Sequence, residues 1–131
     1  ALTLRHPPGH LQRTAAYFLT LGHYDAQVRR MTRVFAERRA ALLAALAAEG
    51  IAAPRGDVSG GSSLWMRAPE EVDTAALARR LRGDGVLIEP GRVFFGSEAG
   101  RRRHYRLAYS SIEADRIPEG VARIAAAMAR V

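Results

Sequence analysis

Short strand-like runs set between amphipathic helices are the feature that most restricts the fold of this 131-residue chain. Apolar residues recur at helical spacing over three stretches, roughly residues 25–49, 73–83 and 114–130. Between them lie apolar runs that are too brief for helices and suit the strands of a small sheet. This order of elements predicts an α+β fold, a two-layer sandwich in which helices pack on a small, largely antiparallel sheet.

The helix near residue 73 has the clearest boundary signals. Asp73 is a favoured N-cap residue, Val72 and Leu77 stand at the two positions of a hydrophobic staple, and Gly83 marks the end. We expect Asp25 to cap the long helix before it in the same way. A shorter helix is predicted upstream, from Gly9 to about Leu21.

The predicted strands are all short. Trp65 lies in one of them, inside the compact run Leu64-Trp65-Met66, and we expect it to be buried in the core. Pro90-Gly91 has the residue types that a type II turn requires, so a turn is expected there. The strand-like segments are Ile51–Arg55, Leu64–Met66, Val86–Ile88, Val93–Phe95 and Tyr105–Ser110.

The charge of the chain comes from arginine alone. Its net charge is +7, with 20 arginines and no lysine. A basic balance is typical of proteins that bind nucleic acid, and an arginine-rich nucleic-acid-binding domain is one interpretation. The arginines are spread along every segment, however, and charge runs are usually solvated surface. This distribution favours a compositional bias.

Several classes of site are excluded or disfavoured by composition. The chain has no cysteine, so disulfides and thiolate metal sites are excluded. Its four histidines are scattered and lack metal-ligand spacing, and we expect no metal. No apolar run approaches the length of a membrane span, so no membrane partner is expected and the cytoplasm is the expected compartment.

The last predicted strand places one charge beside small side chains. A period of two puts Tyr105, Leu107 and Tyr109 on one face and Arg106, with small neighbours, on the other. A guanidinium in such a hollow can bind a carboxylate through two parallel hydrogen bonds. The alternative is a local ion pair with an Asp or Glu at a sheet edge, which the spacing alone favours.

A family resemblance changes that balance. Arg106-Leu107-Ala108-Tyr109-Ser110, together with Gly85–Gly91, resembles the C-terminal small domain of fold-type I aminotransferases, which use pyridoxal phosphate. The resemblance extends from about Tyr24 to the C-terminus. It implies that Arg106 receives the α-carboxylate of a substrate or effector. Gly60, Gly61 and Ser62 either let the backbone approach a ligand closely in the cleft or form an ordinary turn. Pro90-Gly91 either turns the chain toward the cleft or is a plain tight turn.

The same resemblance limits what this chain does alone. Fold-type I aminotransferases hold pyridoxal phosphate as a Schiff base on a lysine, which an arginine cannot replace. Because the chain has no lysine, we expect the cofactor in a longer parent, on a lysine outside this chain, and none on the chain itself. Residues 1–23 are then a linker and helix toward a missing N-terminal portion, and residues 24–131 the small domain.

The regulator and enzyme classes share this domain. Gly22-His23-Tyr24-Asp25 and Glu37-Arg38-Arg39 are more similar to the MocR-type branch of GntR transcription regulators than to catalytic aminotransferases. That resemblance implies a missing DNA-binding domain, an amino-acid-like or pyridoxal effector, and a homodimeric parent. The small domain of a catalytic amino-acid aminotransferase stays open as the alternative.

Overall fold

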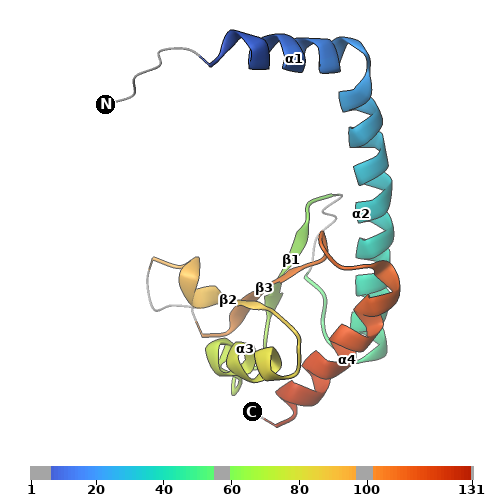
Figure 1. Cartoon of the computed structure of the whole chain (residues 1–131). Helices are drawn as coiled ribbons and strands as arrows, with labels where there is room; N and C mark the ends of the chain where they lie inside the picture. The colour runs from blue at the N-terminus through green and yellow to red at the C-terminus, as the bar shows by residue number, and fades with distance from the viewer. Residues whose placement is uncertain (1–6, 55–59, 97–101, 131) are drawn as a thin grey trace. The chain divides into compact units, whose positions relative to one another are not determined.

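The computed structural model describes residues 7–54, 60–96 and 102–130, in two compact units, Ala1–Val34 and Phe35–Val131 (Figure 1). The first unit contains α1 (Gly9–Thr20) and the start of α2 (His23–Ala48), with Gly22 at φ 74° between them. No residue of α1 is buried. The described helices include none that is both long and apolar enough to cross a membrane.

The start of α2 differs from the expectation. The helix begins at His23, so Asp25 lies inside its first turn and is not the N-cap. A carboxylate there still favours the helix, since it lies near the positive end of the helix dipole. The buried residues of α2 are Leu42, Ala45 and Leu46, all in the second unit.

The second unit contains a three-stranded antiparallel sheet, as predicted. β1 (Ser63–Arg67) and β2 (Glu89–Pro90) flank β3 (His104–Ala108), which is the central strand. Within the register, Trp65 pairs with Arg106 on one side of β3 and Glu89 pairs with it on the other. The helix α3 (Thr74–Gly83) connects β1 to β2, so β3 enters between two strands adjacent in sequence.

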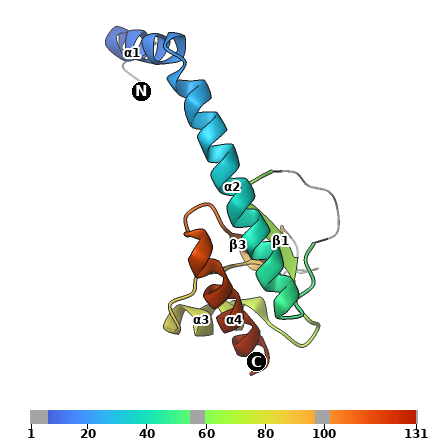
Figure 2. The same ribbon diagram turned by 90° about the vertical axis from the view of Figure 1, so that its right-hand side faces the viewer.

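Helices cover one face of this sheet. Both views show α4 (Ile117–Met128) alongside the C-terminal part of α2 (Figures 1 and 2), and α4 also contacts α3. Side chains from the helices and from one sheet face form a single core, which confirms the two-layer α+β sandwich. The core includes Leu42, Leu46, Leu64, Met66, Leu77, Leu81, Tyr105, Leu107, Tyr109, Val121 and Ile124.

Several predicted strands are wrong in detail. Residues 51–54 and 86–88 form no regular element, and Arg55 lies outside the described residues. The strand predicted at Val86–Ile88 lies immediately after that segment, as β2. The 3₁₀ helix η1 (Gly91–Val93) replaces the predicted strand at Val93, and Pro90-Gly91 is not a type II turn, because Gly91 lacks the positive φ that such a turn requires.

The C-terminal α-helix begins at Ile117, slightly later than the expected start near Ala114. A short 3₁₀ helix, η2 (Ala114–Arg116), leads into α4, where Pro118 lies in the first turn and removes no hydrogen bond. Ile117, Val121 and Ile124 are buried, which matches their three- and four-residue spacing.

The N-terminus of α3 is capped by Asp73, as predicted. The carboxylate accepts hydrogen bonds from the N–H groups of Ala75, at 2.8 Å, and Ala76, at 3.2 Å. A second carboxylate oxygen accepts from Arg102. Burial opposes ionisation of this carboxyl, but the two N–H groups and Arg102 outweigh it, so the pKa of Asp73 lies below its ordinary value of 3.8.

Replacing Asp73 with alanine is expected to lower the free energy of unfolding by about 1–2 kcal/mol at neutral pH. Because the folded-state pKa is lowered, this stabilisation is present above pH 3.8 and is lost as pH falls through the folded pKa. Urea unfolding followed by circular dichroism at pH 7 and pH 3 measures both effects. Asp73→Asn, which keeps a cap acceptor, is the control. If the difference in the free energy of unfolding between wild type and Asp73→Ala were the same at both pH values, the ionised form of Asp73 would not contribute to stability.

Candidate functional site

Arg106 lies on the face of β3 that the helices leave open. Along this strand Tyr105 and Leu107 are buried, whereas the side chain of Arg106 is 41% exposed. The period-two pattern is therefore confirmed. Arg106 belongs to the central strand and not to a sheet edge, so groups from β1 and β2 flank it on both sides.

An acidic side chain already holds the guanidinium of Arg106. Its Nε donates to the Oε2 carboxylate oxygen of Glu89, the residue opposite it on β2. Both side chains are partly exposed, which limits the energy of the pair. The local ion pair considered from the sequence is thus present, and any ligand carboxylate at Arg106 has to share or displace Glu89.

An aromatic cluster surrounds this ion pair. The guanidinium carbon of Arg106 lies 5.4 Å from the ring centroid of Phe94, within the range of a cation–π contact. Trp65 contacts Phe94 edge-on at 5.3 Å and stacks on His104 at 5.7 Å, and Phe95 packs against both Trp65 and His104. This arrangement gives the charged side chain an apolar border on the open face.

The expectation that Trp65 is buried is wrong. Its side chain is on the open face of β1 and the residue is 40% exposed, whereas Leu64 and Met66 on either side are buried. A strand that is covered on one face alternates in this way, so strict period two would have placed Trp65 outward. The sequence patterns did not identify Glu89, Phe94 and His104 as residues of this open face. Their positions beside Arg106 and Trp65 depend on strand register, which a local sequence pattern does not determine.

The Gly60–Ser62 segment lies at the end of the sheet beside Tyr109. Gly60 and Gly61 have φ values of 119° and 89°, a region that side chains disfavour. The hydroxyl of Tyr109 donates to the Gly60 carbonyl at 3.3 Å, and the backbone N–H of Tyr109 donates to the Ser62 carbonyl at 3.0 Å. These bonds fix the segment to the chain just beyond β3, about three residues along the strand from Arg106.

Pro90 and Gly91 lie on the other side of β3. Pro90 pairs with Tyr105, directly beside Arg106, and the buried Gly91 begins η1. The chain then reaches Phe94, whose N–H donates to the Gly91 carbonyl at 2.8 Å. Pro90-Gly91 therefore positions the aromatic side chain that covers the guanidinium.

Beneath Arg106, Tyr105 has an unusual environment. Burial raises the pKa of its hydroxyl from 10.0 to about 12, and no hydrogen-bond partner reaches this oxygen in the described part of the chain. The phenol therefore stays neutral at physiological pH and acts as a packing group. Its charge state does not affect the open face.

Known proteins share both the sequence and the fold of this chain. The HTH-type transcriptional regulator TauR of Rhodobacter capsulatus is 57% identical over 128 residues, which cover 98% of this chain and 26% of the regulator. The crystal structure of LysN, an α-aminoadipate aminotransferase from Thermus thermophilus complexed with N-(5′-phosphopyridoxyl)-L-leucine, superposes with a TM-score of 0.75. That match is 30% identical and covers 87% of this chain and 29% of the enzyme. The chain is an aminotransferase-like domain related to MocR-type regulators.

The aminotransferase-like domain is also similar to a catalytic enzyme in sequence. A 2-aminoadipate transaminase of Thermus thermophilus is 31% identical over 106 residues, covering 80% of this chain and 26% of the enzyme. The domain therefore spans about a quarter of the length of these curated relatives. No model of a known protein family matches the sequence.

The residues of the aminotransferase-like domain do not fit a covalently held pyridoxal phosphate. No side chain in the 131 residues is a lysine, so none offers the amine for a Schiff base. The domain instead offers non-covalent contacts to a ligand: the guanidinium of Arg106 has donors for a carboxylate, and aromatic rings border it.

Proposed function

We propose that this domain is the effector-sensing part of a GntR/MocR-type transcription regulator, in which Arg106 anchors the carboxylate of an amino-acid-like or pyridoxal effector. The observation that carries the proposal is the position of Arg106. It stands on the open face of the central strand, in a domain that is 57% identical to part of an HTH-type regulator. A planar, permanently charged donor at that place suits a carboxylate.

The rest of the full-length protein supplies the other functions in this proposal. A winged-helix domain outside this chain binds DNA, and a lysine outside this chain holds pyridoxal phosphate. The full-length regulator is a homodimer in the cytoplasm. Effector binding at Arg106 then favours one arrangement of the regulator over another, through its different affinity for the two.

The alternative is the small domain of a catalytic amino-acid aminotransferase, and the sequence match to a 2-aminoadipate transaminase supports it. Two measurements on the full-length protein separate the alternatives. If the full-length protein is a regulator, an amino acid or pyridoxal phosphate is expected to change its affinity for operator DNA. The enzyme predicts sustained transfer of amino groups to an oxo acid, with DNA affinity unchanged by either ligand.

A further measurement tests whether the lysine that holds pyridoxal phosphate lies outside this chain. Borohydride reduction of the full-length protein with pyridoxal phosphate, followed by peptide mass mapping, is expected to place the adduct on a lysine outside Ala1–Val131. An adduct on any side chain of Ala1–Val131 contradicts the proposal. A gel shift with this chain alone tests the nucleic-acid-binding interpretation, which requires DNA affinity that falls steeply with salt.

Replacing Glu89 with glutamine is expected to strengthen effector binding by up to about fivefold, because the effector carboxylate no longer competes with an exposed ion pair. Isothermal titration of the full-length protein measures the change. Glu119→Gln breaks a comparable exposed pair with Arg123 and is the matched control, with no expected effect. Weaker binding by Glu89→Gln would show that Glu89 contacts the ligand itself.

A further inference from the structure

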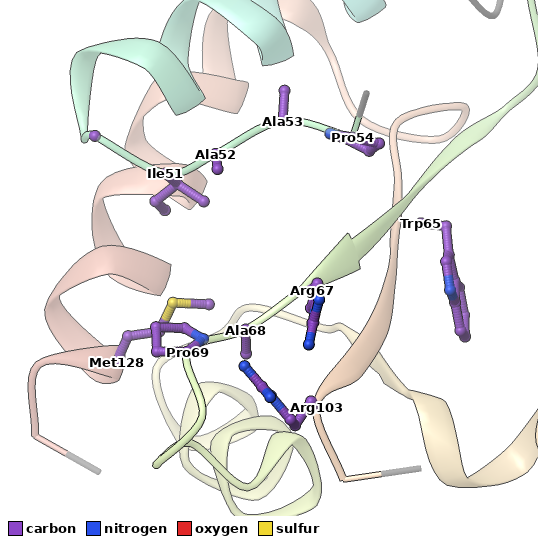
Figure 3. Close-up of a pocket in the computed structure, with 11 residues that line it drawn as sticks. Ile51, Ala52, Ala53, Pro54, Trp65, Arg67, Ala68, Pro69, Arg103 and Met128 are labelled. Atoms are coloured by element: carbon purple, nitrogen blue, oxygen red, sulfur yellow. The ribbon is translucent and has the colours of Figure 1, made fainter. Parts of the chain in front are cut away.

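A pocket of about 720 Å³ lies along the outer edge of β1 and does not include Arg106 (Figure 3). Its volume is within the range typical of small-molecule sites. The chain after α2, the end of β1 with the residues that follow, and the C-terminal turn of α4 form its walls. The pocket includes neither Arg106 nor Glu89, although it shares Trp65 with the aromatic cluster beside their ion pair.

The two sides of the pocket differ in chemistry. Ile51, Pro54 and Met128 give an apolar wall, and two arginines line the pocket as well: Arg67, the last residue of β1, and Arg103, which precedes β3 (Figure 3). Like charges that share a site repel each other unless an anion lies between or beside them. The pocket therefore combines a positive end with a surface that suits an apolar body.

Among the residues that the structure describes, no close acidic partner neutralises either arginine. Arg103 has its Nη1 3.6 Å from an oxygen of Glu70, whose side chain is 87% exposed, so the attraction is weak. The Nε of Arg103 is buried, and no acceptor reaches it within residues 7–54, 60–96 and 102–130. In the same ranges no acidic side chain forms an ion pair with Arg67. A buried donor without a partner is costly, so a change in the position of the Arg103 side chain that brings this donor to an acceptor is favourable.

The backbone holds both arginines in place. The N–H of Ala68 donates to the carbonyl of Arg103 at 2.7 Å, which extends the pairing of β1 with β3 by one residue. The hydroxyl of Thr74 donates to the His104 carbonyl at 2.9 Å and fixes the next residue. Little backbone ordering is then required when a ligand binds, and this lowers the free-energy cost of binding.

We propose that this pocket is a second ligand site, for an organic dianion with an apolar body, such as a phosphate monoester or a dicarboxylate. Arg67 and Arg103 bind the anionic group, and each guanidinium can donate two parallel hydrogen bonds to its oxygens. Ile51, Pro54 and Met128 contact the body, and Trp65 also lines the pocket. Unlike the proposed Arg106 site, this pocket places two cations on one anionic group.

The pocket contains its own spectroscopic probe, because Trp65 is the only tryptophan of the chain. Titration of the full chain with phenyl phosphate is expected to give a saturable change in tryptophan emission. Arg67→Gln and Arg103→Gln are each expected to weaken binding by about tenfold or more. Arg79→Gln, on the exposed side of α3, removes the same charge elsewhere and is expected to have no effect.

Companion ligands test the two parts of the pocket separately. Phenylsuccinate shows whether a dicarboxylate replaces the phosphate group, and phenol lacks the charge and is expected not to bind. Inorganic phosphate alone is expected to bind at least about tenfold more weakly than phenyl phosphate, since it does not contact the apolar wall. Equal affinities for phosphate and phenyl phosphate would contradict the ligand class.

Arg106→Gln separates this site from the proposed effector site, because Trp65 also lies opposite Arg106. The response to phenyl phosphate is expected to persist in this variant. If Arg106→Gln removes the response and the variants of Arg67 and Arg103 keep it, the ligand binds at Arg106 and the second site is wrong. The measurement uses neither DNA nor amino acids, so its outcome does not depend on the proposed regulator.

Discussion

Replacing Arg106 with glutamine is expected to weaken effector binding by the full-length protein roughly 30- to 150-fold, the loss typical of a charge-assisted hydrogen-bonded pair. Glutamine keeps much of the side-chain length but loses the charge and the paired donors. Arg106→Lys keeps the charge without the planar fork, so its affinity for the effector is expected to lie between those of the wild type and Arg106→Gln. Isothermal titration measures the affinities, and DNA binding in the absence of effector is expected to be unchanged.

The ion pair with Glu89 complicates a single substitution. Removing Arg106 leaves the carboxylate of Glu89 without its partner, and that charge would repel an anionic effector. The double variant Arg106→Gln/Glu89→Gln removes both charges, so a cycle of the two single variants and the double variant isolates the contact with the effector. Unchanged affinity in both Arg106→Gln and the double variant would refute the anchoring role.

The second large effect concerns stability. Leu77→Ala is expected to lower the free energy of unfolding by about 2–5 kcal/mol, since this leucine of α3 is fully buried in the core. Leu87→Ala removes the same atoms from a residue that is 74% exposed, and is expected to change stability by less than about 0.5 kcal/mol. Urea unfolding of the full chain, followed by circular dichroism, measures both variants. Equal effects would contradict the position of Leu77 in the core.

Local sequence patterns were sufficient to predict most of the helices and the buried face of β3. The cap at Asp73 follows from residue type and its neighbours, and the burial of Tyr105, Leu107 and Tyr109 follows from period two. These features depend on residues close together in the chain, so the sequence contains the necessary information. The two-layer α+β architecture follows from the order of such elements.

The candidate site required information that local patterns lack. Strand β2 has two residues, too few to show a period, and Glu89 meets Arg106 only through the register of β2 on β3. Arg106 was identified from the family motif, because spacing alone favoured an ion pair. Its partners Glu89, Trp65 and Phe94 come from three other segments, and none was predicted as a neighbour.

The shortness of β2 has a consequence for how the open face responds to a ligand. Only Glu89 and Pro90 pair with β3 in this strand, and Pro90 has no N–H to donate. Segments held by few backbone hydrogen bonds open locally at a lower free energy than a core strand does. Glu89 can therefore leave Arg106 by a small local movement of β2, while β1, β3 and the helices beneath them stay folded.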